Sequence, residues 1–286
     1  MVASKIPTVR RQRLGTELRR LRERAGMSAT AAAGLLGGNQ AQISNIESGR
    51  HGVSADRVRT LACNYECTDE ELISALVGMT GDRERHWWEE YRGVLPSAMQ
   101  DLAELEHHAT ALRIAHSLHF PGLLQTAEHA RTVFRQVVPT LPPHEVEHRV
   151  SHRIKRQTIL YRDAAASLTV VLHEAALRMK FGGPEVTRDQ LRHLAEASTL
   201  SHVTIQVIPF DAGGFPGSGQ SAFYAAAPVP QLDTVQLDQS HGPVFLDAEA
   251  QLSKYRTLLD RLEAVALTPK KSRDFINDIA HQLGKA

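Results

Sequence analysis

Residues 28–50, SATAAAGLLGGNQAQISNIESGR, contain the pattern that most constrains this chain. Two short helices are predicted on either side of the pair Gly37-Gly38, because glycine adopts the backbone angles of a sharp turn without steric cost. Ser28 is the expected N-cap of the first helix and Asn39 that of the second. Gly49 follows the second helix in the position where glycine commonly ends helices. The stretch therefore predicts two helices joined by a tight turn.

The outer face of the second helix carries small and amide side chains: Gln40, Ala41, Gln42, Ser44 and Asn45. An amide both donates to and accepts from one adenine edge in the DNA major groove, which discriminates between bases by roughly 1–3 kcal/mol. An ordinary solvated helix would carry the same residue types. The order of helix, glycine turn, capped helix and terminal glycine favours a DNA reader. We therefore expect base contacts from Gln40, Ala41, Gln42 and Asn45.

Positive charge is concentrated near this unit. Residues 1–60 hold eleven Lys or Arg against four Asp or Glu, a net charge of +7 in a chain whose total is +1. Such a basic end is the electrostatic footprint of a DNA-binding module. Arg10, Arg11 and Arg13 are expected near phosphate. The full set of expected DNA-backbone contacts is Ser28, Asn39, Ser44, Arg50 and Arg11.

Residues 14–76 resemble the Cro/repressor-type helix-turn-helix domain, also called the xenobiotic-response-element type. The matching positions are Leu36, Gly37, Asn39, Gln40, Ile43, Ser44, Ile46, Glu47 and Gly49. The resemblance implies five helices, the third of them for recognition, and a structural ion pair between Arg22 and Glu47. Ala29 stands where the family often has a phosphate-binding Gln, so that contact is either missing or supplied by Ser28. Modules of this kind usually bind DNA as dimers.

The length of 286 residues suggests two domains. The turn at Thr80-Gly81 suggests a helix-turn-helix domain over residues 1–80, a linker region over 81–99 and a regulatory or partner-binding domain over 100–286. We expect the whole to be multidomain: an all-α five-helix domain, then an α+β domain with a small, mostly antiparallel sheet. The expected strands are 111–116, 168–173, 203–208, 221–226 and 234–237. The expected helices are 97–108, 126–138, 142–161, 174–180, 187–200, 247–262 and 272–283.

Residues of about 100–283 resemble the C-terminal domain of actinobacterial WhiJ-type regulators, which are described as antitoxin-like. The matching motifs are Pro121-Gly122-Leu123-Leu124-Gln125-Thr126, Arg156-Gln157, Leu172-His173-Glu174-Ala175-Ala176-Leu177 and Gln206-Val207-Ile208-Pro209. The resemblance implies a regulator that works with a small companion protein often encoded nearby. It implies no ligand, and each motif can equally serve the fold; Glu174, for example, would then pair with Arg156.

The segment His144-Glu145-Val146-Glu147-His148 matches H-E-x-x-H, the zinc-binding helix of metalloproteases, in which Glu145 would be the general base. No third ligand is evident in the sequence, and the neighbouring polar residues Arg149, His152 and Arg153 indicate a solvated face. A metallohydrolase using His144, Glu145 and His148 therefore stays a remote alternative, and we expect no metal, no other cofactor and no catalytic residues.

Other features of the sequence limit the remaining classes. No apolar run reaches the roughly 18 residues of a membrane span, and we expect no secretion signal and a cytoplasmic location. The main hypothesis is a sequence-specific, DNA-binding transcriptional regulator, with residues 39–48 in the major groove of double-stranded DNA. Its C-terminal domain would form a homodimer and sense a companion protein or ligand. The alternative is an antitoxin-like interaction protein that mainly holds a small partner.

Overall fold

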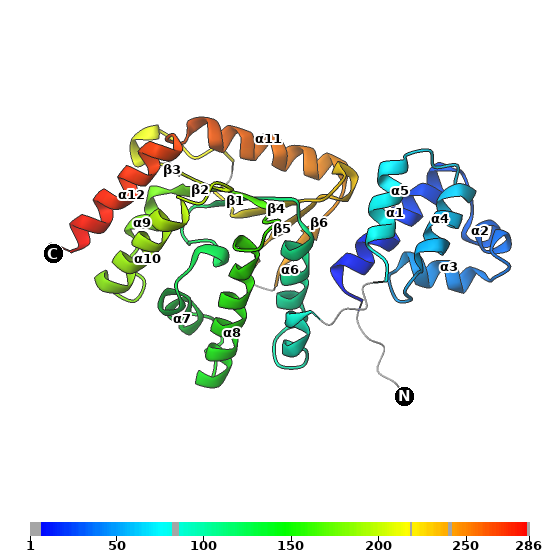
Figure 1. Ribbon diagram of the computed structural model, residues 1–286, viewed down its shortest axis with the longest axis horizontal. Helices are drawn as coiled ribbons and strands as arrows, with labels where there is room; N and C mark the ends of the chain where they lie inside the picture. The colour runs from blue at the N-terminus through cyan, green and yellow to red at the C-terminus, as the bar shows by residue number, and fades with distance from the viewer. Residues whose placement is uncertain (1–6, 82–85, 218, 240–241, 285–286) are drawn as a thin grey trace.

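The computed structural model describes residues 7–81, 86–217, 219–239 and 242–284. An all-helical N-terminal part lies beside a larger part built on one sheet, at the end opposite to the C-terminus (Figure 1). Residues 82–85 of the expected linker lie outside the described residues. Later in that linker, Trp88 and Tyr91 are buried in a short 3-10 helix, η1 (Trp87–Tyr91). Within the described ranges, no helix is both long and apolar enough to cross a membrane.

The N-terminal part consists of five helices: α1 (Val9–Arg24), α2 (Ala29–Leu35), α3 (Gln40–Glu47), α4 (Ala55–Asn64) and α5 (Glu70–Gly78). Each begins after a residue whose side-chain oxygen accepts the backbone N–H three residues further on; these caps are Thr8, Ser28, Asn39, Ser54 and Asp69. Such caps satisfy N–H groups that have no partner within the helix. The predicted pair of helices and its glycine turn are therefore α2, α3 and the segment between them.

α1 and α3 touch through their backbones. A Cβ atom on Gly15 of α1 would lie 2.4 Å from the carbonyl oxygen of Glu47 and 2.5 Å from that of Ile46. Gly49, whose φ is +71°, approaches α1 in the same way, since its Cβ would lie 2.9 Å from the carbonyl carbon of Arg11. Two glycines therefore permit a close helix crossing that fixes the direction of α3.

An ion pair between Arg22 of α1 and Glu47 of α3 also stabilises the crossing of these two helices. Arg22 Nε donates to Glu47 Oε1 at 2.6 Å and Arg22 Nη2 donates to Glu47 Oε2 at 2.9 Å. Arg22 Nη1 also donates to the carbonyl of Met27 at 2.7 Å, which ties down the segment before α2. Both charged side chains are 9% exposed. These hydrogen bonds to Glu47 raise the pKa of Arg22 above its ordinary value. The pair joins α1, α3 and the segment before α2.

The larger part contains a six-stranded mixed sheet in the order β3-β2-β1-β4-β5-β6. Its strands are β1 (Ala111–His116), β2 (Ser167–His173), β3 (Val203–Ile208), β4 (Ala222–Ala226), β5 (Thr234–Leu237) and β6 (Val244–Leu246). β1, β2 and β3 run parallel, with Ile114 opposite Val170 and Val170 opposite Ile205. The other three pairs are antiparallel: β1 with β4, β4 with β5, and β5 with β6.

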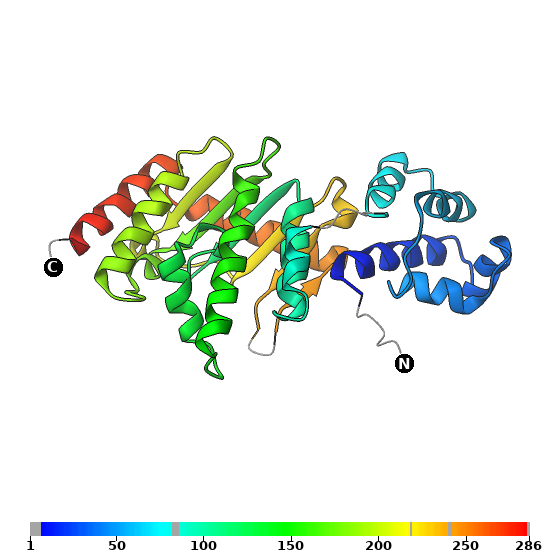
Figure 2. The same cartoon turned by 60° about the horizontal axis from the view of Figure 1, so that its bottom comes forward.

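Helices cover both faces of this sheet. Their bounds are α6 (Ser97–His108), α7 (Ala127–Arg135), α8 (Pro143–Arg156), α9 (Glu174–Arg178), α10 (Pro184–Ala197), α11 (Glu249–Val265) and α12 (Pro269–Leu283). Alternate residues of each strand point to opposite faces. Ile114 and Val170 therefore join the large core beneath α10 and α12, whereas Ala115 and Val171 join the core beneath α11. Figure 2 shows α11 behind the sheet and the other helices in front.

The sequence predicts five of these strands closely, but the expected small and mostly antiparallel sheet is only partly right. Half of the sheet is parallel, because the long helical connections after β1 and β2 return the chain to the same end of the sheet. The three-residue edge strand β6 was not expected, since its sequence is too short to show alternation. The helix expected over residues 142–161 ends at Arg156 and continues as a 3-10 turn.

The two parts share an apolar core. Val229 and Leu232, from the loop between β4 and β5, are each 5% exposed and belong to the same cluster as Leu14 and Leu76 of the helical part. Ion pairs surround this contact: Arg20 Nη2 lies 2.9 Å from Asp247 Oδ1, and Arg13 also donates to the carbonyl of Gln231. The contact therefore fixes α1 against the sheet part.

Replacing Arg22 by Ala strands the carboxylate of Glu47 in a nearly buried position. We expect the free energy of unfolding to fall by about 3 kcal/mol, measured by chemical denaturation. Arg19→Ala is the matched control, because Arg19 forms a 2.7 Å pair with Glu23 on the same helix in a largely exposed position. Equal stability changes in the two variants would show that the Arg22–Glu47 pair does not hold α3.

Replacing Leu232 by Ala opens a cavity between the two parts. We expect a loss of about 3 kcal/mol in the free energy of unfolding, as for other buried leucines. Leu118→Ala changes the same residue type in the sheet part at a side chain that is 47% exposed, and it should have little effect. If Leu232→Ala lowered the free energy of unfolding no more than Leu118→Ala, the contact between the two parts would not persist in solution.

Candidate nucleic-acid interface

α3 presents a polar surface that the protein itself does not use. Gln40, Ala41 and Ser44 are exposed and Asn45 is half-buried. Within the part of the chain that the structure describes, the side chains of Gln40, Ser44 and Asn45 form no hydrogen bond with other protein groups. Ile43 and Ile46 on the opposite side are buried in the core. The helix thus keeps free amides on its outer face, as base contacts require.

Gln42 differs from its neighbours. Its backbone N–H donates to Asn39 Oδ1 at 3.1 Å, and its side-chain oxygen accepts the N–H of Asn39 at 3.4 Å. The two residues form a capping box, which satisfies two N–H groups at the start of α3. Both residues are exposed, but a bidentate base contact from Gln42 would require its amide to leave the cap. Gln40 and Asn45 face no such competition.

The expected phosphate-binding residues lie at two places. Arg11 and Arg50 are both exposed, and the contact of Gly49 with the backbone of Arg11 brings their chain segments together after the end of α3. Ser28 lies at the start of α2, where its hydroxyl accepts the N–H of Ala31 at 3.0 Å. Its hydroxyl proton remains available as a donor. Arg11 and Arg50 are therefore the best-placed cations for a phosphate beside α3.

Several other basic residues of the first sixty serve the protein itself. Arg13 is only 5% exposed and bonds Gln231, so the expectation that it lies near phosphate is wrong. Burial lowers the pKa of the Arg13 guanidinium from its ordinary value. Arg20 pairs with Asp247 and Arg22 with Glu47, while Arg10 donates to the carbonyl of Gly78 at 2.8 Å. The net charge of +7 therefore overstates the charge that can face DNA.

The H-E-x-x-H segment lies in the first turns of α8, with His144 and His148 exposed. Glu145, the expected base, accepts a 2.6 Å hydrogen bond from Arg149. Among the described residues, no group of three or more His, Cys, Asp or Glu could hold a metal ion. The expected solvated face is wrong further along the helix, however, since His152 is fully buried and the Nε atom of Arg153 is inaccessible.

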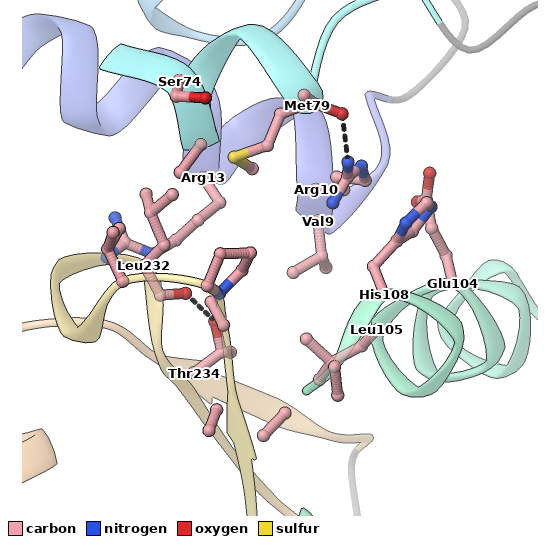
Figure 3. A pocket seen from close by; sticks show the side chains of 18 of the residues that line it. Val9, Arg10, Arg13, Ser74, Met79, Glu104, Leu105, His108, Leu232 and Thr234 are labelled. Carbon is pink, nitrogen blue, oxygen red and sulfur yellow. Dashed lines mark hydrogen bonds between the residues drawn. The ribbon is translucent and has the colours of Figure 1, made fainter. Parts of the chain in front are cut away.

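A cavity of about 730 Å³ separates part of the helical domain from the sheet domain. Figure 3 shows it between α1, α5, α6 and the β4–β5 loop, with the side chains of Val9, Met79 and Leu105 around it. Most of its lining is apolar. Two carboxyl groups, Asp101 and Glu104, stand at one side, and burial raises the pKa of each.

Two motifs of the sheet domain, at residues 121–126 and 156–157, meet at the end of α8. Arg156 does not pair with Glu174, as the structural interpretation expected, but with Glu106 of α6. Glu174 instead accepts hydrogen bonds from Arg178 and from the N–H of Phe210. Gln157 donates to the carbonyl of Gln125 at 2.6 Å, which joins the Arg156-Gln157 motif to the loop over residues 120–126. The spacing of four residues between Glu174 and Arg178 is typical of a helical ion pair, whereas Glu106, Phe210 and Gln125 come from distant elements and had no signal in the sequence.

Comparisons with known proteins find a family model that matches each of the two parts of the chain. A helix-turn-helix domain model matches residues 13–76, which indicates a DNA-binding regulator. The model of a domain of unknown function, DUF5753, matches residues 99–278, well over half of the chain. Searches among curated proteins and among solved structures find no match. The chain therefore belongs to the DUF5753 family and carries a helix-turn-helix domain before the family's own domain.

Proposed function

We propose that the protein is a cytoplasmic, sequence-specific transcriptional regulator of the Cro/repressor type that binds double-stranded DNA as a homodimer. The observation that carries the proposal is the outer face of α3, where the side-chain amides of Gln40 and Asn45 have no hydrogen-bond partner within the described residues. The helix-turn-helix match supports the same function. The double hydrogen bond between Arg22 and Glu47 holds this helix in a fixed direction, which lowers the entropy lost on binding.

In this proposal α3 enters the major groove. Gln40 and Asn45 read base edges and Ala41 contacts a thymine methyl group, while Gln42 joins them when it leaves its cap. Arg11 and Arg50 hold phosphates, with Ser28 and Ser44 as hydroxyl donors. Phosphate contacts set the position of the protein on the duplex, and the amides supply sequence discrimination. The sheet domain lies beyond α1 and outside this surface.

The sheet domain is the proposed sensor. Its resemblance to WhiJ-type, antitoxin-like regulators supports a small companion protein or a ligand as the signal. The contact of Arg13 and Arg20 with the sheet domain gives a physical route, because both residues lie on α1, which also carries Arg22 and packs on α3. A signal changes DNA affinity only if it favours one arrangement of the domains over another. The proposal includes no catalytic step, since Glu145 is engaged by Arg149.

Asn45→Ala tests base reading without disturbing the cap of α3. We expect binding to the cognate DNA site to weaken by about 1–3 kcal/mol, with little change on random DNA. The site is first defined by mapping genomic binding of the native protein. Fluorescence anisotropy then gives both affinities at one salt concentration.

Gln42→Ala is the comparison variant, because it removes a cap as well as an amide. It should lower helix stability as well as affinity, whereas Asn45→Ala should leave the melting temperature unchanged. Equal losses on cognate and random DNA for Asn45→Ala would contradict its role as a base reader.

Arg50→Ala tests the phosphate contact. We expect weaker binding to all sequences, and the slope of log affinity against log salt concentration should become shallower by roughly 0.9 for one lost contact. Arg192→Ala is the control, since Arg192 is a largely exposed arginine of the sheet domain. An unchanged slope for Arg50→Ala would place Arg50 away from the phosphate backbone.

A further inference from the structure

A second, more polar cavity lies within the sheet domain. It encloses about 370 Å³ beside the end of β1, between α6, α8 and the loop over residues 120–126. Its polar lining residues are Glu106, His116, His119, Gln125, Arg153, Arg156, Ser221, Gln236 and Asp238. Pockets of this size hold small organic molecules. Two motifs for which the DNA-binding role gives no explanation, at residues 121–126 and 156–157, converge on it.

The two arginines of this cavity differ in their partners. Arg156 is 5% exposed and donates to both carboxylate oxygens of Glu106, which is 1% exposed. Arg153 makes one hydrogen bond, from Nη1 to the amide oxygen of Gln125 at 2.6 Å. Among the described residues, no carboxylate oxygen lies within 4.0 Å of its guanidinium nitrogens, and its buried Nε has no acceptor. Arg153 is thus a cation without an anion.

Arg153 also lies close to a second positive charge, that of Arg156. A Cβ on Gly122 would lie 3.3 Å from Arg153 Nε and 3.4 Å from Arg156 Nη1, so one point of the loop touches both guanidinium groups. Glu106 neutralises only one of them. Burial, followed by repulsion from Arg156, lowers the pKa of Arg153 to about 9. Arg153 is half-buried and its Nε is inaccessible to water. A charge that is partly shielded from water and has no ion-pair partner is unfavourable unless a ligand supplies one.

Hydrogen bonds hold Arg153 and its loop in place. Gln125 is 2% exposed, and its Nε2 donates to the carbonyl of Phe120 at 2.7 Å, which leaves its Oε1 directed at Arg153. Gln190 donates to the carbonyl of Leu124 at 2.6 Å and accepts the N–H of Thr126 at 2.8 Å. The ring of Phe134 lies 4.2 Å beneath the guanidinium carbon. The guanidinium is therefore positioned before any ligand arrives.

The remaining lining selects the ligand. Ile114, Leu123 and Phe223 supply apolar surface from the core of the sheet domain. His116 is neutral at pH 7, because burial lowers its pKa to about 4, so it adds no positive charge. Asp238 is exposed and accepts a hydrogen bond from Gln236 at 2.6 Å. Because Arg156 and Glu106 neutralise each other, the lining offers one unpaired cation, apolar walls and one further carboxylate, that of Asp238. This combination suits a small anion with an apolar body.

We propose that this cavity binds a small organic carboxylate, with its anionic end on Arg153 and its apolar part against Ile114 and Phe223. Arginine presents its N–H groups in a fork that matches the two oxygens of a carboxylate. The site deepens the sensing role proposed above, and only its regulatory meaning rests on that role. Binding to the cavity is measured without DNA, so its failure and the failure of DNA recognition are separate results.

The test compares the full chain with Arg153→Met, in which an unbranched side chain of similar length replaces the cation. Arg192→Met is the matched control on an exposed arginine. The probes are sodium benzoate, sodium hexanoate and inorganic phosphate at constant ionic strength, with melting temperature and titration calorimetry as readouts. We expect a carboxylate to raise the melting temperature of the wild type and of Arg192→Met. Arg153→Met should bind it at least about tenfold more weakly, as for a lost charge-assisted hydrogen bond.

Stability without ligand gives a second readout. Because Arg153 lacks a counter-ion, Arg153→Met should lower the melting temperature less than the loss of a structural ion pair, since only the hydrogen bond to Gln125 is removed. Asp238→Asn should strengthen carboxylate binding by removing a like charge. The proposal is overturned if neither benzoate nor hexanoate binds the wild type. It is also overturned if Arg153→Met binds as well as the wild type, or if phosphate binds and the carboxylates do not.

Discussion

The packing of α1 on two partners is the constraint on which the rest of the structure depends. Its C-terminal half holds α3 through the double hydrogen bond between Arg22 and Glu47, and Gly15 lets the two backbones touch. Other residues of the same helix, Arg13 and Arg20, bind the sheet domain. A single rigid helix therefore connects the proposed DNA-reading surface with the domain that would receive a signal.

This arrangement divides the arginines of the chain by function. Those facing other protein groups are fixed by carboxylates or carbonyls, and they stabilise the domain contact or the direction of α3. Arg11 and Arg50 remain exposed beside the end of α3, where phosphate would be their partner. Arg153 belongs to neither group, because it is turned inward without an anion. Its cost in stability is best explained by a ligand that completes the site.

The helical domain could be predicted largely from its sequence. Ser28 and Asn39 cap helices through local hydrogen bonds, and glycine turns act within a few residues, so their effect is visible in the chain itself. β-Branched residues likewise indicated the strands over residues 168–173 and 203–208. The same local logic failed for β6, whose three residues pair only because β5 lies beside them. The spacing of Asn39 and Gln42 is the sequence signature of a capping box, and the sequence prediction that Gln42 only faces outward overlooked it.

The sequence by itself determined the order of helices and strands, the capped recognition helix and the motifs of both domains, since each depends on neighbours a few residues apart. The tertiary structure alone decided the parallel half of the sheet, the burial of Arg13 and the partners of Arg156. It also created the cavity around Arg153. These features join residues separated by tens to hundreds of positions, and their energies depend on which charged groups folding brings together away from water.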